Sequence, residues 1–141
     1  MLAFTGFHFG VGRYEEAIAI VLQVKDIVEK KEGKQHPEYS RCLNNLGVLY
    51  RYLREFESAE AMYLEAEQLR AVLLGKEHPE YGNVLNNLGV LYNDMGRYEE
   101  AKNLNLQALS LREKALGKDN PDYALSLNNL GQAYFYLGNF D

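Results

Sequence analysis

Cysteine and long apolar runs are nearly absent from this sequence of 141 residues. Cys42 is the only cysteine, so no disulfide can form within the chain. No apolar run approaches the ~18 residues that a transmembrane helix needs. No Lys or Arg precedes Arg13, whereas a secretory signal starts with basic residues. We therefore expect a cytoplasmic protein.

An excess of positive charge is also missing. The sequence has 15 Lys and Arg against 20 Asp and Glu, which gives a net charge of −5, and the basic residues are spread along the chain. Proteins that bind DNA or RNA usually carry a basic face that neutralises phosphates. Neither a nucleic acid nor a membrane is therefore an expected partner.

Residue patterns typical of enzymes are lacking as well. The sequence contains no phosphate-binding glycine loop and no Ser-His-Asp arrangement. His36 and His78 occupy equivalent positions and raise the alternative of a shared metal, but no third His or Cys completes a ligand set. Cys42 is interpreted as a small core residue rather than a nucleophile. We expect no catalytic residues, no metal and no cofactor, and hence no enzyme.

What the sequence does contain is an internal repeat of 42 residues. His36-Pro-Glu-Tyr39 recurs at 78–81, and Asn120-Pro-Asp-Tyr123 follows after the same interval. Residues 36–77 and 78–119 are identical at 21 of 42 positions, which indicates duplication. Other shared segments are Leu-Asn-Asn-Leu-Gly, at 43–47, 85–89 and 127–131, and Gly-Arg-Tyr-Glu-Glu-Ala, at 12–17 and 96–101.

Each full repeat has the apolar spacing of two amphipathic helices. The proline of each opening motif suits the first turn of a helix, and the residue before it suits the N-cap: His36, His78 or Asn120. Glycines are expected to end the second helices (Gly33, Gly75, Gly117) and to mark the turn inside each hairpin (Gly12, Gly96, Gly138), where the first full repeat has Arg54. We predict a helix at about 13–32, hairpins at 37–74 and 79–116, and a final helix at about 121–137.

These motifs resemble the tetratricopeptide repeat. The 42-residue period and the His-Pro-Glu/Asp-Tyr opening are similar to the long repeats of kinesin light chains, and the resemblance covers about residues 12–141. It implies an all-α, right-handed superhelical solenoid of helix–turn–helix hairpins with a concave groove. The expected organisation is a single solenoid fragment over 1–141, with a partial repeat at 1–35, full repeats at 36–77 and 78–119, and a partial repeat at 120–141. One departure is Asn105, where the family usually buries a large residue.

Paired asparagines recur in the middle of all three first helices. Asn is a poor residue for a helix interior, because its side chain competes for backbone hydrogen bonds. Adjacent helical residues point about 100° apart, so the two amides have different surroundings. In the register that the resemblance implies, the first Asn of each pair (Asn44, Asn86, Asn128) faces the groove, and the second (Asn45, Asn87, Asn129) turns toward the neighbouring helix. The alternative is that both serve packing between repeats.

The resemblance therefore implies a scaffold that holds a partner peptide in its groove. A row of amides can donate to and accept from a peptide backbone. Arginines in the first full repeat favour a ligand with an acidic stretch and an apolar or aromatic anchor. The expected partner-binding residues are Arg41, Asn44, Val48, Arg51, Asn83, Asn86, Val90, Asn93, Asn128 and Gln132, with Leu125 and Phe135 beside them.

A second interpretation places the function at the ends of the array. The first eight residues depart from the repeat pattern, and neither end carries an obvious polar cap, although solenoids need capped ends for solubility. Apolar residues near the carboxyl end would then form a surface for self-association: Leu130, Tyr134, Phe135 and Phe140. In this alternative the chain is a structural or regulatory spacer within a larger protein.

Overall fold

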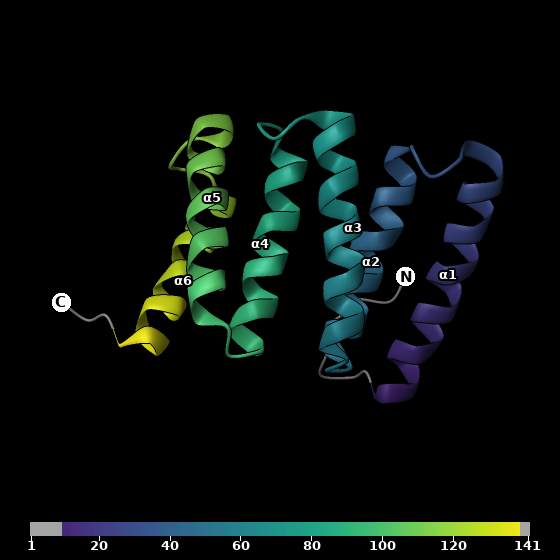
Figure 1. The fold of residues 1–141 in the computed structure, drawn as a ribbon, viewed down its shortest axis with the longest axis horizontal. Helices are drawn as coiled ribbons and strands as arrows, with labels where there is room; N and C mark the ends of the chain where they lie inside the picture. The colour runs from purple at the N-terminus through teal and green to yellow at the C-terminus, as the bar shows by residue number, and fades with distance from the viewer. Residues whose placement is uncertain (1–9, 139–141) are drawn as a thin grey trace. The chain divides into compact units, whose positions relative to one another are not determined.

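The computed structural model describes residues 10–138, and these residues form six α-helices and no strand (Figure 1). The helices are α1 (Val11–Glu32), α2 (Pro37–Tyr52), α3 (Phe56–Leu74), α4 (Pro79–Asp94), α5 (Tyr98–Leu116) and α6 (Pro121–Leu137). The predicted hairpins and the predicted final helix are confirmed, and α1 starts slightly earlier than expected. His8 and Phe140 lie outside the described residues.

The chain divides into two compact units, residues 1–66 and 67–141, with the boundary inside α3. In the first unit α1 packs against α2. Tyr63 of α3 is almost fully buried, and its ring lies so close to Gly47 of α2 that an added Cβ would collide with it. Glycine at 47 is thus required by the approach of the two helices. The core of this unit consists of Tyr14, Ile18, Leu46 and Leu49, with Met62 packed against them.

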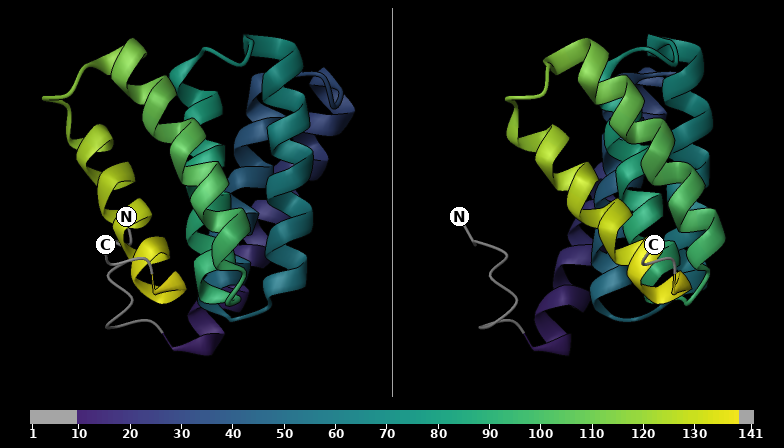
Figure 2. Two further views of the ribbon diagram at one scale, coloured as in Figure 1. Left: turned by 60° about the vertical axis from the view of Figure 1, so that its left-hand side comes forward. Right: turned by 90° about the vertical axis from the view of Figure 1, so that its left-hand side faces the viewer.

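In the second unit α5 lies between α4 and α6, and α6 contacts both of the other helices (Figure 2). Tyr81 and Leu85 of α4 form the core with Ala108 of α5. Asn105 of α5 occupies the position that Tyr63 holds one repeat earlier, and it lies against Gly89 as Tyr63 lies against Gly47. The equivalent contact therefore uses an amide in place of a phenol ring.

The side chain of Asn105 is completely buried, and neither of its polar atoms has a hydrogen-bond partner among the described residues. Burying an amide without such a partner costs free energy, because the lost hydrogen bonds to water are not replaced. The sequence identified this residue as a departure from the repeat, and the structure places the departure at the centre of the helix contact. Asn105 is thus a local weakness in the core of the second unit.

The predicted N-caps are confirmed at all three first helices. The Nδ1 atoms of His36 and His78 each accept a hydrogen bond from the backbone N–H two residues later, at 3.1 Å, and the Oδ1 atom of Asn120 does the same at 2.8 Å. An imidazole that accepts at Nδ1 carries its proton on Nε2. The two histidines thus have a structural role as helix caps.

The turns inside and between hairpins also follow the predicted glycines, with one correction. Gly33, Gly75 and Gly117 end the second helices with positive φ, and Gly96 and Gly138 have positive φ after first helices. Gly12, however, lies inside the first turn of α1 instead of in a turn before it.

Arg54 occupies the turn position that Gly96 and Gly138 hold in the later repeats. Its φ is 62°, in the left-handed region that costs an L-amino acid roughly 1–2 kcal/mol relative to glycine. Its guanidinium lies 5.0 Å from the centre of the Phe56 ring. This cation–π contact offsets part of the backbone strain.

Candidate interaction surface

The predicted row on α2 is accessible along most of its length. Arg41 is exposed and pairs with Glu38 one turn earlier, while Asn44 and Val48 are half-buried. Arg51 is half-buried, and its guanidinium lies 5.8 Å from the centre of the Tyr52 ring. The first unit therefore presents two cationic side chains on one helix, one of them against an aromatic ring.

A hollow of about 240 Å³ lies beside this row in the first unit. Most of its lining is apolar, which suits an aliphatic or aromatic side chain better than a polar one. The exposed Asn45 also lines this hollow, although the sequence predicted that its amide turns toward the neighbouring helix. The hollow is lined by Val21, Asn45, Val48, Leu49 and Tyr52.

The predicted partner-binding residues of α4 are more deeply buried than those of α2. Asn83, Val90 and Asn93 are half-buried, whereas Asn86 is only 5% exposed. The Oδ1 atom of Asn86 accepts a hydrogen bond of 2.8 Å from the Nδ2 atom of Asn129 on α6. Asn86 therefore packs between two first helices, which is the alternative that the sequence left open for these amides.

Asn93 and Asn83 are also tied into the contacts of the second unit. The Nδ2 atom of Asn93 donates to the backbone carbonyl of Asn129 at 3.4 Å, and the Oδ1 atom of Asn83 accepts from Arg112 at 3.0 Å. Two residues of α4 that the sequence did not select are accessible, namely the half-buried Asn87 and the exposed Asp94. At two of the four predicted positions of α4, Asn86 and Asn93, the next residue in the sequence is therefore more accessible than the predicted one.

On α6 the predicted residues lie on an exposed face of the helix. Asn128 and Gln132 are exposed, and so are Leu125 and Phe135 on the same face. In the second unit, α6 covers part of α4, while no helix covers the equivalent part of α6 among the described residues. This difference explains why Asn86 is buried and Asn128 is open. Contact of any of these residues with a partner stays a prediction.

One functional residue was not predicted from the sequence, namely a buried arginine that joins consecutive repeats. Arg112 of α5 is 3% exposed, and it donates to the backbone carbonyl of Asp122 at 3.0 Å and to the hydroxyl of Ser126 at 2.9 Å, both on α6. Arg70 donates in the same way to the backbone carbonyl of Glu80 at 3.0 Å. Burial lowers the pKa of the Arg112 guanidinium, and the carboxylate of Asp122 opposes this. The recurrence of Arg at a 42-residue interval was the signal that could have revealed this clamp.

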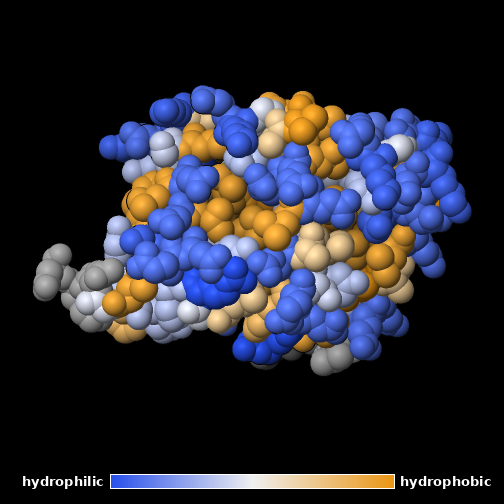
Figure 3. All heavy atoms as spheres, in the orientation of Figure 1, coloured by the Kyte–Doolittle hydropathy of each residue, from blue (hydrophilic) through white to orange (hydrophobic). Residues whose placement is uncertain are grey.

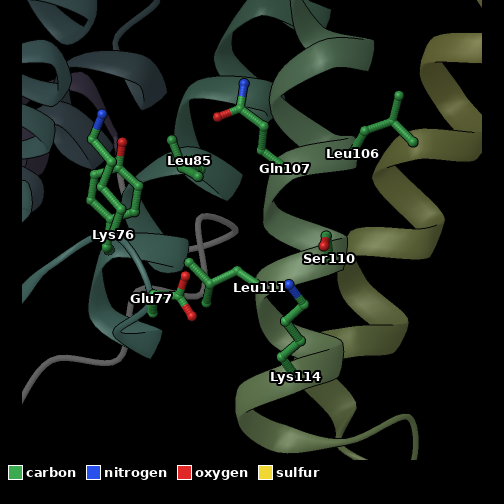
Figure 4. Close-up of a pocket in the computed structure, with 9 residues that line it drawn as sticks. Lys76, Glu77, Leu85, Leu106, Gln107, Ser110, Leu111 and Lys114 are labelled. Carbon is green, nitrogen blue, oxygen red and sulfur yellow. The ribbon is translucent and has the colours of Figure 1, made fainter.

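A larger hollow of about 450 Å³ lies in the second unit, beside α4 and α5 (Figure 4). Figure 4 shows Leu106, Ser110 and Lys114 along α5. The Tyr81 hydroxyl at this site donates to Glu67 at 2.6 Å, and burial together with that bond raises the pKa of Tyr81. On the face in Figure 3, apolar residues gather over α4 and α5 and are bordered by polar residues. The lining combines apolar and charged groups: Lys76, Glu77, Tyr81, Leu85, Leu106, Gln107, Ser110, Leu111 and Lys114.

Nothing in the described residues supplies a metal centre. No group of three or more His, Cys, Asp or Glu lies close enough there to hold an ion. Cys42 is buried, and burial is the main cause of its raised thiol pKa, with Glu38 adding to the effect. Such a thiol is a poor nucleophile, because the thiolate is the reactive form. Between residues 10 and 138 no helix is long and apolar enough to cross a membrane.

Comparison with known proteins agrees with this architecture. The sequence profile of the tetratricopeptide repeat matches residues 6–71, 64–114 and 80–141. Among curated proteins, none is similar enough in sequence to count as a relative.

Several solved structures have the same fold. BtubC (BKLC) from P. vanneervenii is 30% identical with a TM-score of 0.84, over 92% of this chain and 52% of its own. A Podospora anserina protein of the kinesin light chain type, with nearly identical TPR-like repeats, is 25% identical with a TM-score of 0.82, over 90% of this chain and 60% of its own. A variant of that fungal protein has a TM-score of 0.75 at 25% identity, over 92% and 61%. The chain thus spans between about half and three-fifths of these proteins.

These matches confirm the resemblance to kinesin-light-chain-like repeats and the all-α solenoid class that the sequence predicted. Repeats of this kind generally mediate contacts between proteins and are generally not enzymes. The chain belongs to the tetratricopeptide repeat family.

Proposed function

We propose that this chain is a cytoplasmic protein–protein interaction scaffold that binds an extended partner peptide along its first helices. The observation that carries the proposal is on α2, where Arg41 and Arg51 lie on the same helix as Val48 and Tyr52, which line an apolar hollow. A peptide with an acidic stretch next to one large apolar or aromatic side chain would complement this combination of charge and shape.

The arginines supply the directional part of the binding. A guanidinium donates two parallel hydrogen bonds to a carboxylate, and such charge-assisted bonds are about twice as strong as neutral ones. Arg51 lies over the Tyr52 ring, which limits the number of positions that its side chain samples before a ligand arrives. Arg41 forms an ion pair with Glu38 at the solvent-exposed surface, and such pairs are weak. An acidic ligand can therefore compete with Glu38 for the Arg41 guanidinium.

The amides of α4 and α6 have two different roles in this proposal. Gln132 and Asn128 are exposed and can pair with a peptide backbone, as can the half-buried Asn83. Asn86 is nearly inaccessible and is bonded to Asn129, so its contribution is to hold α6 against α4. We therefore place recognition on the arginines and the exposed amides, with Asn86 as a positioning residue.

The test is a selection of peptides from a random display library on the immobilised chain, followed by affinity measurements with fluorescent peptides. We expect the selected peptides to share an acidic run beside an aromatic or large aliphatic residue. The double variant Arg41→Ser/Arg51→Ser should bind them at least about tenfold more weakly, since a hydrogen bond to a charged group contributes about 1.5–3 kcal/mol.

A matched control separates local recognition from net charge. Lys30 and Lys31 are exposed on α1, so Lys30→Ser/Lys31→Ser removes the same charge from a different helix and should leave the affinity within about twofold. Circular dichroism must show equal helicity for both variants. Equal loss of affinity in both, or selected peptides without acidic residues, would contradict the proposal.

A further inference from the structure

A hollow in the second unit has no part in the proposed peptide site. It has a volume of about 450 Å³, and its lining residues all fall between Lys76 and Lys114. They belong to the loop before α4, to α4 and to α5, so one unit of the chain supplies the whole lining (Figure 4). The volume is in the range of pockets that hold small molecules, about 300–1,000 Å³. This hollow is therefore a candidate site for a small ligand.

The buried part of the lining is apolar. Tyr81 and Leu85 belong to the core of the unit, and Leu111 packs against them. The Tyr81 hydroxyl already donates to Glu67, so the phenol offers its ring to the hollow while its polar end is satisfied. Leu106 is 41% exposed and extends the apolar surface toward solvent. A hydrocarbon group in the hollow would remove this surface from water, which is favourable.

The accessible part of the lining is polar and carries a net positive charge. Lys76 and Lys114 are exposed, and neither ammonium group forms an ion pair with another described residue. Figure 4 shows Lys76 and Glu77 on one side of the hollow and Ser110 and Lys114 on the other. Two lysines and one glutamate give the lining a net charge of +1, whereas the whole chain carries −5. A ligand with one negative charge would neutralise the lining.

The lining positions on α5 differ from those of the preceding repeat in a way that favours an anion. Gln107 replaces a glutamate, and Lys114 replaces a valine, so each change adds one positive charge. Ser110 replaces a glutamine and shortens the side chain at that position. In the loop, Glu77 replaces a glutamine and removes one positive charge, which leaves a net change of +1. The second full repeat thus has a charge and a smaller side chain here that the first does not have.

We propose that this hollow binds a small monocarboxylic acid with an aliphatic chain. The chain lies against Leu85, Leu106 and Leu111, and the carboxylate accepts charge-assisted hydrogen bonds from the ammonium groups of Lys76 and Lys114. This site goes beyond peptide binding and uses no residue of α1 or α2.

The lining favours a carboxylate over other head groups. A phosphate monoester carries about −1.5 to −2 charges at pH 7, and its second charge would lie in the same hollow as the carboxylate of Glu77. An alcohol with the same chain would contact the apolar surface but would leave the charge of Lys76 and Lys114 unneutralised. The expected ligand is therefore a monoanion that carries its charge at one end.

A titration of the ¹⁵N-labelled chain with octanoate, followed by amide chemical shifts, tests the proposal. The series runs to about 5 mM, which covers dissociation constants in the millimolar range and below. Octanoate should give saturable shifts that are concentrated at residues 76–85 and 106–114. 1-Octanol has the same chain length without the carboxylate, and it should bind at least about fivefold more weakly.

Three variants separate the charge from the apolar surface. Lys114→Val introduces the residue of the preceding repeat and should weaken octanoate binding at least about fivefold, while 1-octanol binding stays within about twofold. Leu106→Ser should weaken the binding of both compounds. Lys118→Ser is the matched control, because Lys118 is exposed and lies outside the lining, and it should bind octanoate within about twofold of the wild type. All three side chains are exposed, so the amide spectra should show that each variant stays folded.

Three outcomes would overturn the proposal. They are the absence of saturable shifts with octanoate, equal affinity for octanoate and 1-octanol, and an equal loss of octanoate affinity in Lys114→Val and Lys118→Ser. The Arg41→Ser/Arg51→Ser variant should bind octanoate like the wild type, so this test and the peptide test fail independently of each other.

Discussion

Replacing Asn105 by leucine should stabilise the second unit. Leucine has the same branching as asparagine, with two methyl groups in place of the amide nitrogen and oxygen. Both of these amide atoms are buried and have no partner among the described residues. A buried polar group without a partner costs about 1–3 kcal/mol, and the slightly larger methyl groups return about 1 kcal/mol of that as crowding against Gly89. We expect a net gain of about 1 kcal/mol in the free energy of unfolding.

The assay is urea unfolding followed by circular dichroism, with thermal melting as a second measure. For a chain of 141 residues, 1 kcal/mol corresponds to roughly 3 °C, so the melting temperature should rise by roughly 3 °C. The equivalent position supplies the matched control. Tyr63→Asn should lower the stability by about 3–5 kcal/mol, because it empties the space that the ring fills against Gly47.

An unchanged or lower stability of Asn105→Leu would refute the reasoning. It would mean that the amide is satisfied in solution, for example by a buried water that bridges it to the backbone. The choice between these outcomes is also informative for function, because a satisfied amide would mark a polar site inside the helix contact. A stabilised variant would show that the asparagine is retained at a cost to the fold.

Three further predictions concern the turns, the caps and the thiol. Arg54→Gly should raise the stability by about 1 kcal/mol, since it relieves the left-handed backbone, and Gly96→Arg should lower it; chemical denaturation measures both. His78→Ala should cost about 1 kcal/mol of stability in thermal melts, whereas His78→Asn should be nearly neutral, because Asn120 caps α6 with the same geometry. Cys42 should react slowly with iodoacetamide in the folded chain and rapidly in urea, since its raised pKa keeps the thiolate scarce in the fold at neutral pH. Arg54→Gly without gain, a His78→Asn variant as weak as His78→Ala, or equal alkylation rates in both states would contradict the respective argument.

The helices could be predicted almost residue by residue, because their signals are local. A proline after a capping His or Asn fixes where each first helix begins, and glycine fixes where the second helix ends. These signals depend on the backbone alone and repeat with the sequence. The beginning of α1 was less well predicted because Gly12 suggested a turn, whereas this glycine lies in the first turn of the helix.

The surroundings of individual amides could not be predicted as well. Asn86 and Asn128 have the same place in the repeat, yet one is buried and the other exposed, because α6 lies over α4 and no described helix lies over α6 in the same way. Periodicity gives the direction of a side chain from its own helix, but it does not say which element lies opposite. The burial of Arg112 was missed for a related reason, since an isolated arginine in a helix is usually solvated.

The arginine clamp has a consequence for how such an array grows. Arg70 and Arg112 bind the backbone carbonyls of Glu80 and Asp122 in the first turn of the next helix, and every amino acid supplies a carbonyl at that place. The backbone part of the attachment between repeats therefore travels with the upstream repeat, and only the added bond from Arg112 to the Ser126 hydroxyl depends on a side chain of the downstream one. A gene segment encoding residues 78–119 could be copied or moved within the array and still be fastened at its new junction. Duplication would then yield a joined protein at once, before any substitution adapts the new boundary.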